Sequence, residues 1–298
     1  MTTLGARWRA LVWLGWASVL SACIATPQSD ALRTSVPPDL ASRVLLESVP
    51  FHPQEDYQCG PAALATVLQT ADVDVSPEAL VSQVYIPARR GSLQLEMLAT
   101  ARRYGRIPYE LRTELGAVLA EVDAGRPVLV MQNLGLNRWP QWHYAVVVGY
   151  DLDEATITLR SGVIRDYTVS LQLFERTWQR AEHWAVVALR PGELPVAAEP
   201  LRYFETVALF EEVAESSLPD NAEMAELTSE AWEAGYEAWP TDRLIAVGLS
   251  NHAYERGELE RAEAILERLL EHSPDYEVAQ QNLVHVRLEL AQREQADD

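Results

Sequence analysis

The segment QEDYQCGPAAL, residues 54–64, places a cysteine where a helix begins. Small and apolar residues follow Gly60, and this pattern continues to Thr70 as expected for a buried helix. Cys59 is therefore expected in the first helical turn, behind a polar loop. The N-terminal end of a helix carries partial positive charge, which favours a thiolate and lowers the pKa of a thiol. The position predicts a reactive thiol at Cys59 that is alkylated even below neutral pH.

The segment WHYAVVVGYD, residues 142–151, places His143 at the start of an apolar strand. A nucleophile at a helix start and a base on a strand is an arrangement used for acyl transfer. Gln54 can bring its side-chain amide to the backbone N–H of Cys59, and two such donors stabilise an oxyanion. The alternatives are a core cysteine with a core histidine, and a metal site of Cys59, His143 and His52, which lacks closely paired ligands.

Together these two segments resemble the papain-like cysteine peptidases related to the bacteriocin-leader-processing, or double-glycine leader, family. The shared features are a Gln before a Cys-Gly-Pro-Ala sequence and a His-containing strand that ends in Gly-Tyr-Asp; here 84 residues separate Cys59 from His143. The resemblance covers about residues 44–190 and implies an α+β papain-like domain. It also implies that Cys59 is the nucleophile, His143 the general base and acid, and Gln54 the oxyanion donor, without a metal or cofactor.

The residue that orients the histidine departs from the family, which has Asp or Asn there. The corresponding stretch here is LRSG, residues 159–162. Ser161 or Asp166 can reach His143 if a hairpin turns before them, whereas Asp151 lies eight residues along the same strand, about 26 Å away. A hydroxyl orients an imidazole more weakly than a carboxylate does. A catalytically weak or inactive peptide-binding protein is therefore the alternative function.

The pattern between residues 44 and 190 predicts helices first and an antiparallel sheet afterwards, which is typical of an α+β domain. The expected helices cover residues 60–70, a segment starting at Pro77 behind Ser76, 92–104, 113–124 and 171–180. The expected strands cover residues 44–50, 127–131, 143–150, 156–159, 164–169 and 184–190.

Residues 1–22 have the features of an export signal, with two arginines before a short apolar run. The run ends in Leu-Ser-Ala-Cys, residues 20–23, which resembles a bacterial lipobox. We therefore expect Cys23 to carry the lipid anchor; an ordinary signal peptide cut nearby is the alternative. By resemblance to lipoprotein sorting, Ile24 favours the periplasmic face of the outer membrane in a bacterial cell envelope. Residues 23–43 are expected to form an irregular tether.

Residues 191–200 contain three prolines and are expected to form a linker. The helical pattern after them, residues 201–298, has 23 acidic residues and 7 arginines. Pro240 and Pro274 lie 34 residues apart, the length of a tetratricopeptide repeat. The segment resembles such repeats, in which helices stack into a superhelix; a generic pair of helical hairpins is the alternative.

The best repeat covers residues 241–274, in which Gly257, Ala262 and Leu266 occupy the expected turn and contact positions. A degenerate repeat covers residues 203–240, and a capping helix covers 275–292. We expect residues 201–298 to form an all-α unit that can be separated from the first domain. Repeats of this kind are expected to bind a protein partner.

The composition excludes several classes of protein. The 298 residues include 44 acidic and 24 basic ones, all arginine, with a net charge of −20. Binding a nucleic acid requires clustered positive charge, so this class is excluded. Two cysteines exclude a disulfide scaffold and a four-cysteine zinc site. The sequence predicts a lipid-anchored cysteine peptidase that acts on a peptide or protein substrate and contacts the membrane through its anchor.

Overall fold

The computed structural model describes residues 25–35, 37–53, 58–217 and 222–297. Within these ranges the largest sheet has seven strands, all paired antiparallel. Its order is β4 (Ile107–Glu110), β9 (Ala185–Leu189), β5 (Val128–Asn133), β6 (Trp142–Asp151), β7 (Thr156–Ser161) and β8 (Ile164–Ser170), and β1 (Arg43–Leu45) also pairs with β6. β2 (Tyr85–Ile86) and β3 (Gly91–Ser92) form a separate small hairpin.

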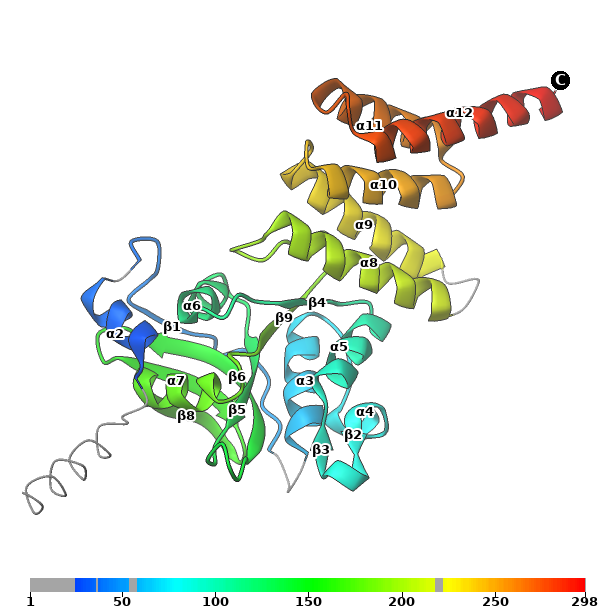
Figure 1. Cartoon of the computed structure of the whole chain (residues 1–298). Helices are drawn as coiled ribbons and strands as arrows, with labels where there is room; N and C mark the ends of the chain where they lie inside the picture. The colour runs from blue at the N-terminus through cyan, green and yellow to red at the C-terminus, as the bar shows by residue number, and fades with distance from the viewer. Residues whose placement is uncertain (1–24, 36, 54–57, 218–221, 298) are drawn as a thin grey trace, which may run out of the picture.

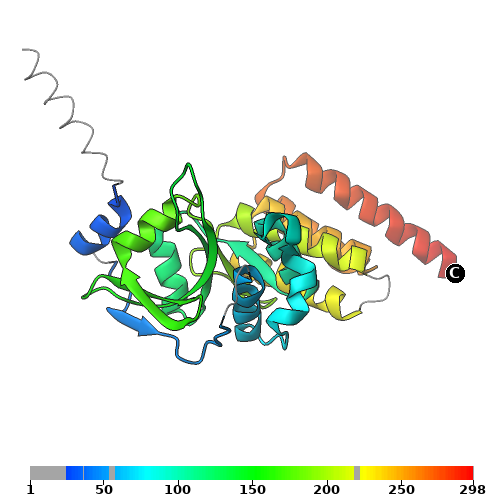
Figure 2. The same ribbon diagram turned by 90° about the horizontal axis from the view of Figure 1, so that it is seen from below.

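Helices cover both faces of the sheet because side chains alternate along each strand (Figures 1 and 2). On one face, residues such as Leu129 and Val146 pack with α3 (Cys59–Thr70), α4 (Pro77–Val84) and α5 (Gln94–Arg103). On the other face, residues such as Val130 and Val147 pack with α6 (Leu115–Asp123) and α7 (Leu171–Gln179). The predicted α+β arrangement is confirmed, but strand β4, between α5 and α6, is absent from the expected strands because its four residues carry no clear strand pattern.

Helix α3 is buried from Gly60 to Leu68, which explains why its sequence is small and apolar throughout. Its second residue must be glycine, because a Cβ atom on Gly60 would lie 2.2 Å from the Oγ atom of Ser92 in β3. At the start of α4 the Ser76 side chain accepts a hydrogen bond from the Ala79 N–H, as its sequence predicts. The close approach of Gly60 to Ser92 places the first turn of α3 against the β2–β3 hairpin.

The prediction that residues 23–43 form an irregular tether is wrong for part of this segment. Residues 27–34 form helix α2 (Pro27–Thr34), which buries Ser29 and Leu32. The buried carboxylate of Glu175 in α7 accepts hydrogen bonds from the backbone N–H groups of Gln28 and Ser29, at 3.0 and 2.6 Å, and from the Ser29 hydroxyl. A carboxylate at a helix N-terminus satisfies its free N–H groups, so α7 holds α2 in place.

After residue 200 the chain consists of helices that stack away from the sheet (Figure 1). They are α8 (Pro200–Ser217), α9 (Ala222–Ala238), α10 (Arg243–Glu255), α11 (Leu259–His272) and α12 (Glu277–Asp297). The expected repeat at residues 241–274 corresponds to α10 and α11, and the expected capping helix to α12. None of the helices in the described ranges is long and apolar enough to cross a membrane.

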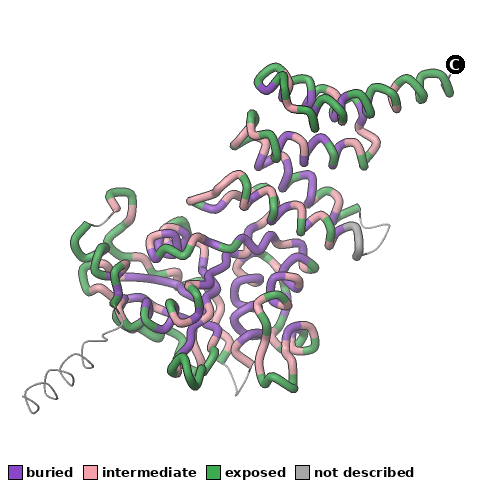
Figure 3. The backbone as a smooth tube through the Cα atoms, in the orientation of Figure 1, coloured by how far each residue is buried: buried purple, intermediate pink, exposed green. Residues whose placement is uncertain are grey.

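The expected linker at residues 191–200 is tightly attached to the first domain. The Val196 N–H donates to the buried carboxylate of Glu121 at 2.6 Å, and the Glu199 N–H donates to the Tyr109 hydroxyl at 3.2 Å. Helix α8 packs against α5 and β4, so that one apolar core runs from the sheet into α8–α10 (Figure 3). The helices that the sequence predicts to be separable thus share one apolar core with the first domain.

Candidate active site

Cys59 and His143 line one cleft of about 990 Å³. The first turn of α3 supplies Cys59, and the start of β6 supplies His143. These elements meet because α3 packs directly on β6. The structure therefore brings together the two groups that the sequence singled out, although 84 residues separate them.

The backbone N–H groups of Tyr144, Gly60 and Cys59 itself lie near the Cys59 sulfur and act to lower its pKa. These donors favour the thiolate, as the helix start predicts. Burial is the larger influence, and it raises the pKa of the Cys59 thiol above its ordinary value. The sequence-based prediction of a lowered pKa is therefore wrong in sign, because the sulfur packs against the apolar core between α3 and the sheet.

The imidazole of His143 is oriented by a hydroxyl. Its Nε2 atom lies 2.8 Å from the Oγ atom of Ser161 at the end of β7. Of the two residues that the sequence left open, Asp166 is instead paired with the buried guanidinium of Arg160. Burial lowers the pKa of His143, so the neutral imidazole is favoured. Asp151 lies at the other end of β6, where it pairs with Arg43 at 3.6 Å.

Two residues that the sequence analysis did not single out complete the floor of the cleft. The Tyr144 hydroxyl donates to the backbone carbonyl of Ser92 at 3.3 Å, and its ring packs edge-on against Trp184. The Ser92 Oγ atom is buried and has no hydrogen-bond partner among the described residues. The only sequence signal for Tyr144 is its position directly after His143. Ser92 has no such signal, because it is far from both motifs in the sequence.

The remaining predicted site residues are placed as follows. Gln54 and Cys23 lie outside the described residues. His52 is hydrogen-bonded through Nε2 to Oε1 of Gln69 at 2.9 Å. Within the described ranges, no group of three or more His, Cys, Asp or Glu side chains could hold a metal ion.

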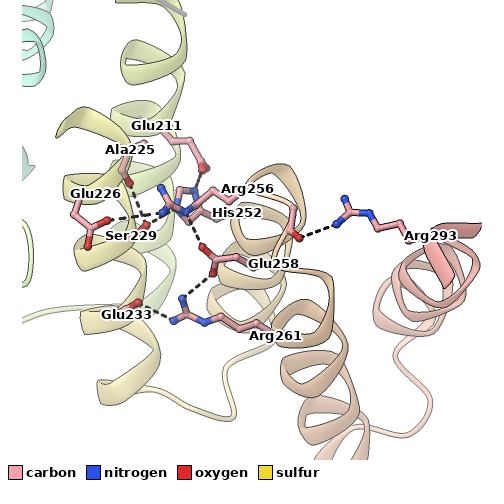
Figure 4. A network of polar contacts seen from close by, with 11 residues as sticks. Glu211, Ala225, Glu226, Ser229, Glu233, His252, Arg256, Glu258, Arg261 and Arg293 are labelled. Carbon is pink, nitrogen blue, oxygen red and sulfur yellow. Dashed lines mark hydrogen bonds and ion pairs between the residues drawn. The ribbon is translucent and has the colours of Figure 1, made fainter. Parts of the chain in front are cut away.

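A second serine–histidine–carboxylate cluster lies among α8, α9 and α10 (Figure 4). His252 contacts Glu211 through Nδ1 at 2.5 Å and Ser229 through Nε2 at 2.9 Å. The Ser229 hydroxyl is buried and also donates to the backbone carbonyl of Ala225 at 3.0 Å. Its proton is thus already engaged within the helix, and the cluster acts as a polar contact that joins three helices.

Residues 46–186 match the Peptidase_C39 like family, a segment that contains Cys59, His143 and Ser161. No curated protein matches the chain. Three solved structures are similar over its first half. A putative C39-like peptidase from Bacillus anthracis is 19% identical, with a TM-score of 0.42, over 50% of this chain and 98% of that one.

The second is a double glycine motif protease from an AMS/PCAT transporter in complex with the leader peptide. It is 21% identical, with a TM-score of 0.36, over 49% of this chain and 96% of that one. The third is the peptidase domain of Streptococcus ComA, a bi-functional ABC transporter involved in quorum sensing. It is 20% identical, with a TM-score of 0.38, over 47% of this chain and 98% of that one.

Proposed function

We propose that the segment matching the Peptidase_C39 like family is a cysteine peptidase that hydrolyses peptide or amide bonds. The observation that carries this proposal is the shared cleft, in which Cys59 and His143 lie together while Ser161 holds Nε2 of the imidazole. With Nε2 engaged, Nδ1 is the ring nitrogen left to exchange a proton with the thiol. The neutral forms of both groups are favoured by burial, so the reaction begins with a proton transfer.

In the first half of the reaction, the Cys59 sulfur attacks the carbonyl carbon of the scissile bond while its proton passes to His143. The tetrahedral intermediate collapses, the C–N bond breaks, and His143 returns the proton to the leaving amine. A thioester remains on Cys59. In the second half, His143 takes a proton from water as the oxygen adds to the thioester carbonyl. Collapse breaks the C–S bond, releases the carboxylic acid, and returns the proton to the sulfur.

The oxyanion formed in both halves needs hydrogen-bond donors. The backbone N–H of Cys59 is one donor at the helix start, and we assign the side-chain amide of Gln54 as the second. Replacing Gln54 with Ala should reduce hydrolysis by about 10²–10³-fold, the usual cost of removing one such donor. The alkylation rate of Cys59 should change little, because alkylation forms no oxyanion.

We also propose that Cys23 carries a lipid anchor and that the protein lies at the periplasmic face of the outer membrane. The support is the lipobox-like sequence that ends the apolar run of residues 1–22. Mass spectrometry of the mature N-terminus should find acyl chains on Cys23. A free N-terminus at a later residue contradicts the anchor.

The helices after residue 200 are proposed to be tetratricopeptide repeats that bind a protein partner. The support is the 34-residue spacing of Pro240 and Pro274, together with helices α10 and α11 between them. Pull-down with the full chain and with a variant lacking residues 241–298 should give partners that require the repeats. Identical partners for both proteins contradict this role.

The peptidase proposal is tested with a library of internally quenched peptides. The full chain should cleave a subset of them, Cys59→Ala should abolish cleavage, and His143→Ala should reduce it by about 10²–10⁴-fold. His272→Ala is the matched control, because His272 is exposed on α11 and bonds only the backbone carbonyl of Arg268 among the described residues. If the Cys59→Ala protein still cleaves the peptides, the assignment of Cys59 as the nucleophile is rejected.

A peptide-binding protein without turnover is the second candidate, favoured by the hydroxyl of Ser161 where the family has a carboxylate or amide. In that case peptides bind equally well to the unmodified chain and to Cys59→Ala, and neither protein yields a cleaved product. Binding is measured by fluorescence anisotropy of fluorescein-labelled peptides of the same sequences as the library.

A further inference from the structure

The cleft around Cys59 has a charge opposite to that of the chain. Among the described residues, its charged lining side chains are Arg89, Arg90, Arg180 and Glu182, three cations and one anion. The whole chain has 44 acidic residues against 24 arginines. The described part of the lining thus has more cationic than anionic side chains where the substrate of the proposed peptidase would lie.

A second cavity in the same molecule provides an internal comparison. It lies between α5, β4 and α8, and its volume is about 730 Å³. Its charged lining residues are two arginines and four carboxylates: Arg102, Arg202, Glu110, Glu199, Glu205 and Asp242. That cavity has the acidic character of the chain as a whole. The excess of cationic side chains is therefore found in the cleft around Cys59 and not in the second cavity.

Arg180 is held in place at the end of α7. Its Nε atom donates to the backbone carbonyl of Asn133 at 3.1 Å. Asn133 is itself buried, and its side-chain oxygen accepts the N–H groups of Gly135 and Gln141 at 3.0 and 2.9 Å. Among the described residues Arg180 takes part in no salt bridge. A half-buried guanidinium that is already ordered loses little entropy when it binds a carboxylate.

The rim of the cleft is built on unusual backbone. Arg90 and Glu182 both line the cleft, and both have a left-handed conformation, with φ of 50° and 57°. This conformation is costly for residues other than glycine, and such residues concentrate at sites that bind ligands. Arg89, next to Arg90, ends the short 3-10 helix Pro87–Arg89 and is exposed. Arg89 and Arg180 thus reach the cleft from different elements.

Apolar side chains complete the lining. Trp142 is 53% exposed, and Leu93 and Met131 also face the cleft. A large exposed indole at the entrance of a cleft is suited to contact a side chain of a bound peptide. The lining therefore combines apolar contact with cationic groups.

We propose that the cleft around Cys59 selects peptides with acidic side chains, and that Arg180 and Arg89 are the residues that determine this specificity. The inference rests on the proposed peptidase function and names its substrate class. Charge complementarity carries it: a carboxylate of the substrate pairs with the guanidinium of Arg180 or Arg89, neither of which forms a salt bridge with another of the described residues. Glu182 on the same rim repels an acidic side chain beside it, so the substrate carboxylates are expected to lie next to Arg180 and Arg89 and away from Glu182.

The test uses the full chain and twin peptides that differ only by Asp→Asn and Glu→Gln. The acidic twin should be cleaved with a kcat/KM about tenfold higher, and this preference should shrink as salt is added. Arg180→Gln and Arg89→Gln should each lower the ratio of kcat/KM for the acidic twin to kcat/KM for the neutral twin about threefold to tenfold. Arg176→Gln is the control, because Arg176 is exposed on α7 and does not line the cleft.

A binding measurement separates the two proposals. Cys59→Ala protein is titrated into fluorescein-labelled acidic and neutral twins, and anisotropy is recorded. Preferential binding of the acidic twin without any cleavage by the unmodified chain supports the acidic specificity and rejects the catalysis. If both twins are cleaved equally and bound equally, the acidic specificity is rejected, while the proposed peptidase activity stands. If Arg180→Gln lowers the thermal midpoint of unfolding, Arg89→Glu serves as the deciding variant, because Arg89 is exposed and its replacement does not disturb the core. Arg89→Glu should reverse the preference for the acidic twin over the neutral twin. An unchanged preference overturns the proposal.

Discussion

At the scale of single residues, Cys59 is subject to two opposing influences. Three backbone N–H groups favour its thiolate, and burial favours the thiol and prevails, so that the pKa is raised. The resting sulfur is therefore protonated at neutral pH. We expect its alkylation by iodoacetamide to be slow at neutral pH and to rise in the alkaline range, above the ordinary thiol pKa of about 8.5. The measurement is the rate of alkylation against pH, by mass spectrometry.

His143 provides the second half of this prediction. Because burial lowers its pKa, the imidazole stays neutral and able to accept a proton below its ordinary value of about 6.5. Hydrolysis should therefore persist at pH values where an ordinary histidine is already charged, and should fall only at lower pH. Alkylation that is fast below neutral pH and slowed by His143→Ala would instead show a thiolate–imidazolium pair, and would contradict the raised thiol pKa.

Ser161 is expected to act as a positioning residue for His143. Ser161→Ala removes the group 2.8 Å from Nε2, and should lower kcat roughly threefold to tenfold, since a neutral hydrogen bond contributes about 0.5–1.5 kcal/mol. Ser161→Asp should raise kcat and shift the acid limb of the pH profile upward, because a carboxylate stabilises the imidazolium. Thr158→Ala, on the same strand, is the control. An acid limb that does not move in Ser161→Asp excludes this role.

At the scale of secondary-structure elements, α2 depends on one carboxylate. Glu175→Ala leaves the N–H groups of Gln28 and Ser29 and the Ser29 hydroxyl without their acceptor. We expect the free energy of unfolding in urea to fall by about 1–3 kcal/mol, the cost of unsatisfied buried donors. Limited proteolysis should also cut earlier within residues 25–43. Gln179→Ala, exposed on the same helix, should change neither result, and an equal loss in both variants would contradict the role of Glu175.

At the scale of the whole molecule, the two halves share one core. Tyr203 and Phe210 of α8 belong to the same apolar cluster as Ile107 and Tyr109 of β4. We expect the full chain to unfold in a single transition, and residues 201–298 expressed alone to be helical but less stable, since the face of α8 that packs on α5 and β4 becomes exposed. Circular dichroism against temperature measures both. Two separate transitions in the full chain, with the fragment melting like the second, would contradict a shared core.

Most helices and strands of the first domain were predictable from local patterns, although β4 and α2 were not. The small apolar residues after Cys59 specify a buried helix, Ser76 specifies the start of α4, and the apolar run after His143 specifies a central strand. The two motifs also predicted which two side chains meet in one cleft. These features require only the periodicity of side chains and the capping of backbone groups.

Other features of the site depend on residues far apart in the chain and follow only from the folded structure. The thiol pKa of Cys59 follows from burial against the sheet, so its helix position gave the wrong sign. Ser161 rather than Asp166 meets His143 because the register of β6 and β7 sets which side chains are neighbours. Helix α2 forms where Glu175, 146 residues from Ser29, satisfies its first turn. Desolvation, strand register and long-range hydrogen bonds arise only when distant segments pack together, which no local pattern encodes.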